Sequence, residues 1–422
     1  MVVAQQKEFG NVQDGQQGRA IDYSSRGKRI ALVVAHLGPG GAQRVITTAA
    51  NELAKKGLDV HVITILEGPG DAYDLDFGVR RHRCRAAPKS NEHAANRTPP
   101  LVSDCNVSSW RPAVVLNGFH VFRRVFVAIA FGSALQGRAR WLRRTLKQIE
   151  PDAVLSFLTQ TNILTIVATR GLGIRTVVSE RNDPRLQKHR RRVELMRRAA
   201  YRFADCVTAN SYGAVGALAE FVAEDKLAFL PNPLSMQQSG PKNDFRAPIF
   251  ITVTRLVEQK GLDVLLRACA KVFRVLPFWR LAIVGDGPLR QQLESLADQL
   301  GIADRVEWVG HVRDPAPYLR AAEFFVLTSR FEGSPNALLE AMALGLPAVI
   351  SDASPGPIEL IGGGAAGLVV PVEDVDATSA AILRLAQDAE LRGCLGEAAK
   401  AMTRGHQLDT AMQTWLKILK CC

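Results

Sequence analysis

Residues 324–350 read FFVLTSRFEGSPNALLEAMALGLPAVI, and this stretch carries more structural information than any other part of the chain. The apolar run at its start is typical of a buried strand in a parallel sheet. Ser334 is a residue type favoured at a helix N-cap, and Pro335 suits the first helical position. Gly345 and Pro347 mark the end of the helix. The stretch therefore predicts a strand, a short loop and a helix in immediate succession.

The start of this predicted helix is small and open, which suits a bound anion. The backbone N–H groups of Asn336 and Ala337 have no partner within the helix and carry the positive end of its dipole. A phosphate binds well at such a position. Glu332 precedes the helix, and Glu340 lies roughly 7–8 Å along it at about 1.5 Å per residue. One carboxylate can therefore hold hydroxyls on one side of a bound diphosphate, and the other carboxylate can hold hydroxyls on the far side. A nucleoside-diphosphate sugar has this layout of sugar, diphosphate and ribose.

The Glu-x7-Glu spacing of Glu332 and Glu340, together with the segments RFEG, SPN and ALGLPAV, resembles the retaining glycosyltransferases of family 4, also called group 1. The resemblance implies an α/β protein with the GT-B fold, in which two doubly wound Rossmann-like domains face each other across a cleft. It also implies that Glu332 contacts the donor sugar and Glu340 the ribose, with the donor against Ser334, Asn336 and Ala337. The spacing alone would be compatible with two chance surface glutamates.

Two cations follow the strand predicted at 249–253, in the segment TRLVEQKG at 254–261. Ligands of α/β folds bind outside the carboxyl ends of such strands. Fixed cations there neutralise the charge that develops on a leaving diphosphate. The segment matches the family's Arg-x4-Lys-Gly element, so the resemblance assigns Arg255 and Lys260, with Glu332, to catalysis. A surface loop with ordinary charges is the alternative interpretation.

Glycine turns end three other predicted strands. Gly285, Asp286 and Gly287 form a tight turn that lines the nucleotide pocket in the family, and His311 lies in a segment that reads the base or caps a loop. Gly40 and Gly41 lie in the first strand-to-helix loop (38–43, GPGGAQ), which lacks the third glycine of dinucleotide-binding proteins. By resemblance this loop faces the donor diphosphate across the cleft.

The segment SERND at 179–183 is the candidate for acceptor binding in the N-terminal half. Many members of the family have histidine where this chain has Arg181, so we assign no histidine general base. Glu180 and Arg181 are predicted to position the acceptor, as is Asn210 at the end of the next strand. A purely structural role is an equally open alternative for Asn210.

The composition is that of a globular protein of two domains, with 422 residues, 47% hydrophobic and 22% charged. The seven cysteines show no CxxC spacing, which predicts reduced thiols in the cytoplasm and no zinc site. The predicted organisation is a disordered leader at 1–27, an N-terminal acceptor domain at 28–232, and a proline-rich linker at 233–248. A nucleotide-sugar domain at 249–405 and a helix at 406–422 that crosses back to the N-terminal domain complete it.

The charge of +12 is unevenly distributed, since residues 1–232 hold 34 Lys/Arg and 20 Asp/Glu. Such asymmetry predicts a polyanionic partner. The predicted helix 190–204 alternates arginines with apolar residues, which suits an anionic membrane surface or a lipid diphosphate, although a solvated helix face has the same pattern. We therefore expect a cytoplasmic protein peripheral to the inner face of the cell membrane.

The segments SERND and FEGSPNALLEAMALGLP look most like those of bacterial enzymes that extend lipid-linked oligosaccharides or exopolysaccharides, some of them N-acetylgalactosaminyltransferases. The resemblance implies a metal-independent hexosyltransferase without a cofactor, with a nucleotide sugar, most readily a UDP-sugar, as donor and a polyprenyl-diphosphate-linked acceptor. Two alternatives come from other classes. One is a GT-B enzyme that transfers no sugar, such as a UDP-N-acetylhexosamine 2-epimerase. The other is a basic nucleic-acid-binding protein, which the absence of a recognisable binding module in the sequence disfavours.

Overall fold

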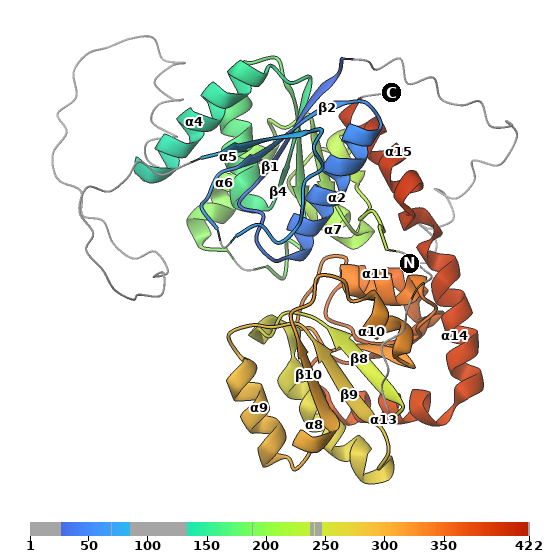
Figure 1. The fold of residues 1–422 in the computed structure, drawn as a ribbon. Helices are drawn as coiled ribbons and strands as arrows, with labels where there is room; N and C mark the ends of the chain where they lie inside the picture. The colour runs from blue at the N-terminus through green and yellow to red at the C-terminus, as the bar shows by residue number, and fades with distance from the viewer. Residues whose placement is uncertain are drawn as a thin grey trace, which may run out of the picture.

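A computed structural model describes the chain in six segments, which are residues 27–68, 70–84, 133–187, 189–236, 240 and 247–420. Two α/β domains lie one above the other, and the last helices run along one side from the second domain to the first (Figure 1). The predicted fold class is confirmed by two wholly parallel sheets. The predicted leader, except Gly27, and the C-terminal cysteine pair lie outside the described residues.

The N-terminal domain is built on seven parallel strands in the order β3-β2-β1-β4-β5-β6-β7. The strands are β1 (Arg29–Val34), β2 (Asp59–Thr64), β3 (Val79–Arg83), β4 (Ala153–Phe157), β5 (Arg175–Glu180), β6 (Cys206–Ala209) and β7 (Leu227–Phe229). The helices are α2 (Gly41–Lys55), α4 (Ser133–Ile149), α5 (Thr159–Thr169), α6 (Arg191–Tyr201) and α7 (Tyr212–Leu218), with a 3-10 turn η1 (Glu224–Lys226). Successive side chains of β1 enter different clusters, because a strand presents alternate residues to opposite faces.

The C-terminal domain has six parallel strands in the order β10-β9-β8-β11-β12-β13. They are β8 (Ile249–Val253), β9 (Arg280–Val284), β10 (Val306–Gly310), β11 (Phe324–Leu327), β12 (Ala348–Ser351) and β13 (Gly367–Val370). Its helices are α8 (Leu262–Val275), α9 (Arg290–Gln299), α10 (Ala316–Ala321), α11 (Asn336–Ala343), α12 (Pro355–Leu360), α13 (Val375–Gln387) and α14 (Ala389–Met402). The 3-10 turns are η2 (Glu258–Lys260), η3 (Ala303–Arg305), η4 (Gly362–Gly364) and η5 (Thr403–His406).

Strand order reverses once in each sheet, between β1 and β4 and between β8 and β11. In open parallel sheets, ligands bind outside the carboxyl ends of the strands at these switch points. The two switch points face each other, because the loop after β1 and the start of α11 after β11 are joined by a hydrogen bond. In that bond, Asn336 Nδ2 donates to the carbonyl of Gly41 at 3.2 Å. The topology therefore places one ligand crevice between the domains.

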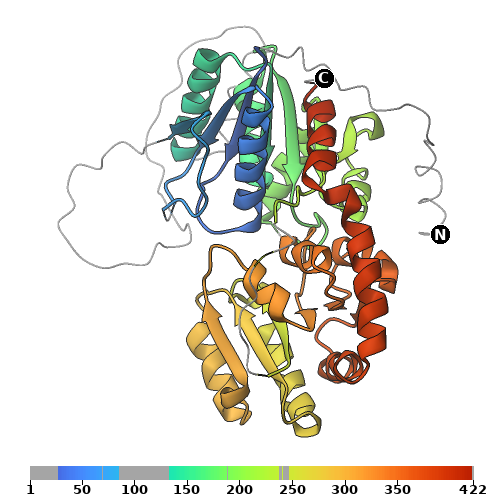
Figure 2. The same cartoon turned by 45° about the vertical axis from the view of Figure 1, so that its right-hand side comes forward.

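The chain crosses between the domains twice, and the two crossings lie side by side. Leu234 forms a parallel bridge with Gln407, and the Leu234 N–H donates to the carbonyl of His406 at 2.8 Å. The last helix, α15 (Leu408–Leu419), then packs on the N-terminal domain, as the red helices of Figure 2 show. Its Met412, Trp415 and Leu416 belong to the same buried cluster as residues of β1 and α2.

The structure also corrects several predicted element boundaries. Asn336, not Pro335, is the first residue of α11, and extended Pro335 occupies the N-cap, so Ser334 does not cap this helix. The edge strand β3 has no clear signal in the sequence, because its arginines obscure the strand pattern. The sequence pattern also missed α7, α10, α12 and α14. Most of these helices are short, and several contain glycine or proline, so their periodicity is weak.

Trp415 provides a test of how far the crossing helix stabilises the N-terminal domain. Its indole is fully buried, lies 5.9 Å from the Phe157 ring between centroids, and donates from Nε1 to the Pro231 carbonyl at 3.0 Å. Trp415→Ala should lower the free energy of unfolding by about 3–5 kcal/mol, because it leaves a large cavity. Urea denaturation followed by circular dichroism measures this. Gln413→Ala, on the exposed face of α15, is the control, and equal losses for both variants would contradict the prediction.

Candidate active site

The centre of the crevice holds a buried ion pair between Lys260 and Glu332. Lys260 Nζ lies 2.5 Å from Glu332 Oε1, and the two side chains are only 14% and 7% exposed. Ser329 donates to the same oxygen at 2.7 Å. The structure thus brings together two of the three residues predicted for catalysis. Arg255, the third, lies exposed in the loop after β8.

Close packing between two loops places this ion pair. Gly261 has a left-handed backbone (φ 59°), and a Cβ at this position would lie 2.1 Å from the Thr328 carbonyl oxygen. Thr328 Oγ1 in turn donates to the Gly261 carbonyl at 3.0 Å. Glycine is therefore required after Lys260, because the loop that follows β8 must approach the end of β11 this closely.

Serines behind Glu332 fix the loop that carries it. Ser354 Oγ accepts from the Glu332 N–H at 3.0 Å and donates to the Glu332 carbonyl at 2.8 Å. Ser351 Oγ donates to the Ser329 carbonyl at 2.6 Å. Ser351 is the last residue of the neighbouring strand β12 and Ser354 follows it, so the orientation of Glu332 is set by the adjacent strand as well as by its own.

The start of α11 is held by Asn232, which lies where the chain leaves the N-terminal domain. Asn232 Nδ2 donates to the Ser334 carbonyl at 2.9 Å and to Asn336 Oδ1 at 2.5 Å. Asn336 and Ala337 are half-buried at the helix start, and Ser334 is buried with a hydroxyl that has no partner among the described residues. The predicted anion site therefore has polar groups from both domains around it.

Glu340 lies deeper on α11 and pairs with a residue of the other domain. Arg44 of α2 approaches Glu340 Oε1 at 2.7 Å. Burial raises the pKa of the Glu340 carboxyl, and the charge of Arg44 opposes that rise. The second carboxylate oxygen, Oε2, is buried and accepts no hydrogen bond from any described residue.

The glycine turn at 285–287 packs against the loop after β8. A Cβ at Gly285 (φ 138°) would lie 1.8 Å from the Thr254 carbonyl oxygen, and one at Gly287 would lie 2.5 Å from that of Leu256. Asp286 is exposed and accepts from the Gly287 N–H at 2.7 Å. His311, after β10, is also exposed. The turn thus lies at the carboxyl edge of the sheet, and the nucleotide-binding roles of these residues stay predictions.

The N-terminal wall of the crevice comes from the ends of three strands. Gly41, the first residue of α2, is exposed beside Asn336, and Gly40 at the N-cap of this helix is half-buried. A Cβ at Gly333 would lie 2.2 Å from the Arg181 carbonyl oxygen and 2.9 Å from Asn210 Oδ1. The loop that contains Glu332 and Gly333 therefore touches the ends of β5 and β6 directly, and the domains are closed on each other.

Arg181 is a buried cation without an ion-pair partner among the described carboxylates. Its guanidinium donates to Asn232 Oδ1 and to Ser179 Oγ, and it lies 4.5 Å above the centre of the Phe157 ring. Burial lowers the pKa of Arg181 to about 9, which leaves it protonated at neutral pH. The wall beside Gly333 thus carries an uncompensated positive charge, which favours an anionic ligand.

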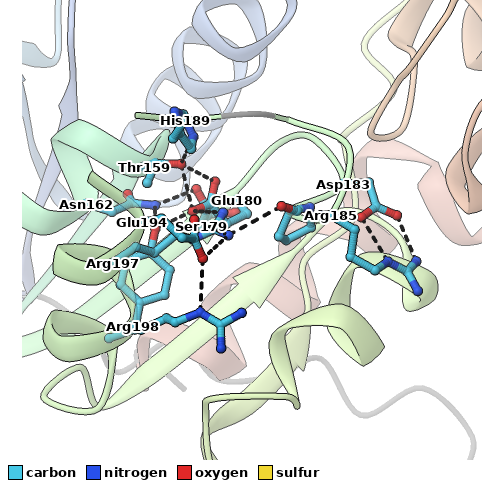
Figure 3. Close-up of polar contacts among 12 residues, drawn as sticks. Thr159, Asn162, Ser179, Glu180, Asp183, Arg185, His189, Glu194, Arg197 and Arg198 are labelled. Carbon is cyan, nitrogen blue, oxygen red and sulfur yellow. Dashed lines mark hydrogen bonds and ion pairs between the residues drawn. The ribbon is translucent and has the colours of Figure 1, made fainter. Parts of the chain in front are cut away.

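Glu180 lies within a polar network of the N-terminal domain (Figure 3). Its carboxylate accepts from Thr159 at 2.9 Å and from the Tyr201 hydroxyl, and His189 contacts Thr159 Oγ1 at 3.0 Å. Burial raises the pKa of the Glu180 carboxyl. These partners anchor the SERND segment to the N-terminal domain through Glu180. The predicted contact of Glu180 with an acceptor stays a prediction.

Four buried polar atoms around the crevice have no hydrogen-bond partner among the described residues. They are Glu340 Oε2, Ser334 Oγ, Asn210 Oδ1 and Thr254 Oγ1. A buried polar group without a partner costs about 1–3 kcal/mol. Their concentration at the carboxyl ends of the strands is what a site for a polar ligand requires.

Sequence reasoning missed three residues that the structure brings into this site, which are Arg44, Asn232 and Ser354. Arg44 comes directly after the glycine loop at 38–43 and was a detectable signal, since a cation in the first turn of a helix opposes the helix dipole. Asn232 lies between Pro231 and Pro233, which in the sequence indicated only the boundary between the two domains. The sequence held no signal for Ser354, because its hydrogen bonds to the Glu332 backbone depend on the packing of two neighbouring strands.

Within the described residues, no group of three or more His, Cys, Asp or Glu side chains is arranged to hold a metal ion. In the same part of the chain, no helix is long and apolar enough to span a bilayer.

Comparison with known families matches two models that follow each other along the chain. Residues 40–233 match the glycosyl transferase 4-like domain, and residues 236–402 match the glycosyl transferases group 1. The chain therefore belongs to the group 1 glycosyltransferases, and the predicted family resemblance is confirmed.

Curated relatives include two Campylobacter jejuni enzymes that span nearly the whole chain. One, a GalNAc-alpha-(1->4)-GalNAc-alpha-(1->3)-diNAcBac-PP-undecaprenol alpha-1,4-N-acetyl-D-galactosaminyltransferase, is 25% identical over 93% of this chain and 98% of its own length. The other, an N-acetylgalactosamine-N,N'-diacetylbacillosaminyl-diphospho-undecaprenol 4-alpha-N-acetylgalactosaminyltransferase, is 24% identical over 90% and 96%. An exopolysaccharide phosphotransferase of Streptomyces coelicolor is 35% identical, but the match spans 46% of this chain and 20% of that protein.

Solved structures show the same fold at low sequence identity. Sucrose-phosphate synthase from Thermosynechococcus elongatus has a TM-score of 0.73 at 18% identity, covering 93% of this chain and 98% of that one. Anabaena HepE in complex with UDP has a TM-score of 0.69 at 16% identity, covering 93% and 100%. These likenesses confirm the GT-B arrangement of two Rossmann-like domains.

The ion pair at the centre of the site makes a stability prediction. Lys260→Met leaves the Glu332 carboxylate buried without its cation, which should lower the free energy of unfolding by about 3 kcal/mol. The matched control is Lys271→Met, whose pair with Asp376 is 47% and 81% exposed and is worth less than about 1 kcal/mol. Urea denaturation of both variants measures the difference. Similar losses would show that the Lys260 pair is not effectively buried.

Proposed function

We propose that the protein is a retaining hexosyltransferase that moves a hexose or N-acetylhexosamine from a nucleoside-diphosphate sugar, UDP-linked, to a lipid-linked saccharide in surface-glycan synthesis. The observation that carries the proposal is the crevice itself. It combines the Lys260–Glu332 pair, the open start of α11 and buried polar atoms without partners, all at the facing switch points of two Rossmann-like domains. The family match supports transfer over the epimerase and nucleic-acid-binding alternatives.

In this proposal the donor lies along the loop and first turns of α11. The diphosphate occupies the helix start at Asn336 and Ala337, where unpaired N–H groups and the helix dipole favour an anion. Lys260 and Arg255 supply positive charge on the C-terminal side. Glu332 orients the sugar, and Glu340 accepts a hydrogen bond from the ribose. The glycine turn at 285–287 and His311 then border the nucleotide.

The acceptor approaches from the N-terminal wall. Arg181 and Asn210 directly follow neighbouring strands and touch the loop of Glu332, which supports a role for them beside the acceptor. The buried charge of Arg181 suits the phosphate of a polyprenyl-diphosphate-linked acceptor. The Campylobacter relatives, whose names specify undecaprenyl-diphosphate-linked substrates, support this class of acceptor.

The proposed chemistry proceeds with retention of configuration. The acceptor hydroxyl attacks from the face that the diphosphate leaves, the bond from the anomeric carbon to the diphosphate breaks, and a diphosphate oxygen takes the hydroxyl proton. Lys260, Arg255 and the helix start stabilise the departing charge without a metal. Glu332 acts as an orienting group, which differs from the two-carboxylate scheme of glycosidases.

The exposed face of α6 supports the proposal that the protein binds to the inner face of the cell membrane. Arg191, Arg192 and Arg198 are exposed there, and the exposed side chain of Leu195 lies among them. Arg197, another arginine of the predicted basic helix, is instead buried and pairs with Glu194 at 2.7 Å. Exposed arginines around an apolar side chain suit the headgroups of an anionic bilayer.

Nucleotide release tests the proposed reaction directly. Wild-type protein is incubated with a panel of UDP-hexoses and UDP-N-acetylhexosamines and a membrane lipid extract, and free UDP is measured. We expect release with one donor, dependent on the extract, and reduced about 100-fold in Glu332→Gln because the sugar loses its orienting group. Glu397→Gln, at an exposed site on α14, should release UDP like the wild type.

The products of this reaction decide between the alternatives. Transfer to a soluble saccharide alone would contradict the lipid-linked acceptor. Release of UDP with a free epimerised sugar would favour the epimerase. The anomeric proton coupling of the product reports whether configuration is retained.

Vesicle flotation tests the membrane surface. The double variant Arg191→Glu/Arg192→Glu should weaken binding to phosphatidylglycerol-containing vesicles at least about tenfold, since each basic residue contributes about 1 kcal/mol. The matched control reverses Arg267 and Arg274, exposed residues of α8 in the other domain. Equal losses for the two variants would indicate a general charge effect and contradict a specific surface on α6.

A further inference from the structure

An ion pair across the crevice joins Arg44 of the N-terminal domain to Glu340 of the C-terminal domain. Arg44 is 27% exposed at its side chain and Glu340 is 6% exposed, and the guanidinium nitrogen lies 2.7 Å from Glu340 Oε1. The two residues belong to different domains, so the contact exists only while the domains are closed. Opening the crevice would separate the charges.

Only one of the two carboxylate oxygens of Glu340 has a partner among the described residues. Oε1 faces Arg44, whereas Oε2 is buried and has no hydrogen-bond partner among the described residues. A carboxylate oxygen accepts hydrogen bonds and cannot donate them when ionised. The chemical match for this oxygen is a ligand group that donates, such as a hydroxyl, and Arg44 pairs with the other oxygen, Oε1.

The surroundings of Arg44 support a role at a ligand site. The residue lies in the first turn of α2, where its N–H donates to the Gly40 carbonyl at 3.0 Å, so the glycine loop fixes its backbone. Its side chain lines a narrow hollow between the domains with Asn336 and Glu340. It also borders a wider one with Tyr73 and Arg313. Arg44 thus lies between the start of α11 and open space at the edge of the crevice.

We propose that Arg44 is a positioning residue for the nucleotide, acting through Glu340. Arg44 holds the Glu340 carboxylate ionised and aimed, so that Oε2 receives a ribose hydroxyl of the donor. The inference rests on the proposed function. It assigns the N-terminal domain a part in nucleotide binding through Arg44, which contacts Glu340 and not the nucleotide itself.

This arrangement couples nucleotide binding to domain closure. The charge of Arg44 reaches Glu340 only in the closed form, so a nucleotide held by Glu340 binds that form more tightly than the open one. By linkage, the bound nucleotide stabilises closure to the same extent. The donor would thus help to bring the acceptor wall, with Arg181 and Asn210, against the loop of Glu332.

A double-mutant cycle on nucleotide binding tests the proposal. Titration calorimetry gives the dissociation constant of UDP for the wild type, Arg44→Gln, Glu340→Gln and the double variant, with GDP and ADP in parallel. Arg44→Gln should bind the nucleotide about tenfold more weakly, as expected when one partner of a largely buried ion pair is removed. The double variant should bind within about threefold of the weaker single variant, because both changes interrupt one contact.

Two further variants separate positioning from a general structural role. Arg44→Lys keeps a positive charge near Oε1 and should recover most of the affinity. Lys55→Gln removes a positive charge at the end of the same helix, where the Lys55 side chain is 61% exposed, and should bind like the wild type. Thermal unfolding of each variant checks that the fold is intact.

The outcomes distinguish this inference from the proposed function. Additive losses in the double variant, or unchanged affinity in Arg44→Gln, would overturn the role of Arg44 while leaving nucleotide binding established. A wild type that binds none of the three nucleotides would overturn the proposed function, and the inference with it.

Discussion

The hydrogen bonds of Asn232 are the constraint on which the rest of the crevice depends. Its side chain, 1% exposed, accepts from Arg181 of one domain and donates to Ser334 and Asn336 of the other. Its carbonyl accepts from the His406 ring at 3.2 Å, where the chain crosses back. One residue therefore joins both crossings and both walls. Because a buried amide must satisfy these partners at once, it restricts the angle between the domains.

Given that angle, the charges of the crevice form a consistent pattern. Each of the two glutamates of the Glu-x7-Glu pair has a cation, but from different domains: Lys260 neutralises Glu332 locally, and Arg44 neutralises Glu340 across the gap. Arg181 has no such partner among the described carboxylates. The site thus combines oriented carboxylates, which suit hydroxyl groups, with the positive charge of Arg181, which suits an anion.

The polar network around Glu180 connects this crevice to the outer surface. Arg197 of α6 is buried within 3.9 Å of Glu180 and is held by Glu194, while Arg191, Arg192 and Arg198 of the same helix are exposed. The inner side of α6 therefore anchors the segment that follows SERND, and the outer side presents charge. In the proposed function, the surface for the bilayer and the wall for the acceptor therefore belong to the same domain.

The sequence by itself determined the fold class and most of the donor loop. Apolar runs between glycine turns specify buried parallel strands. The spacing of Glu332 and Glu340 follows from the local geometry of a strand, a loop and a helix, whereas the glycine after Lys260 is required by the close approach to Thr328. Tertiary structure decided which charges meet. The pairing of Arg44 with Glu340, the burial of Arg197 and the contacts of Asn232 join residues far apart in the chain. Local periodicity reports the face of an element, but only the packing of whole domains selects the partner across a gap.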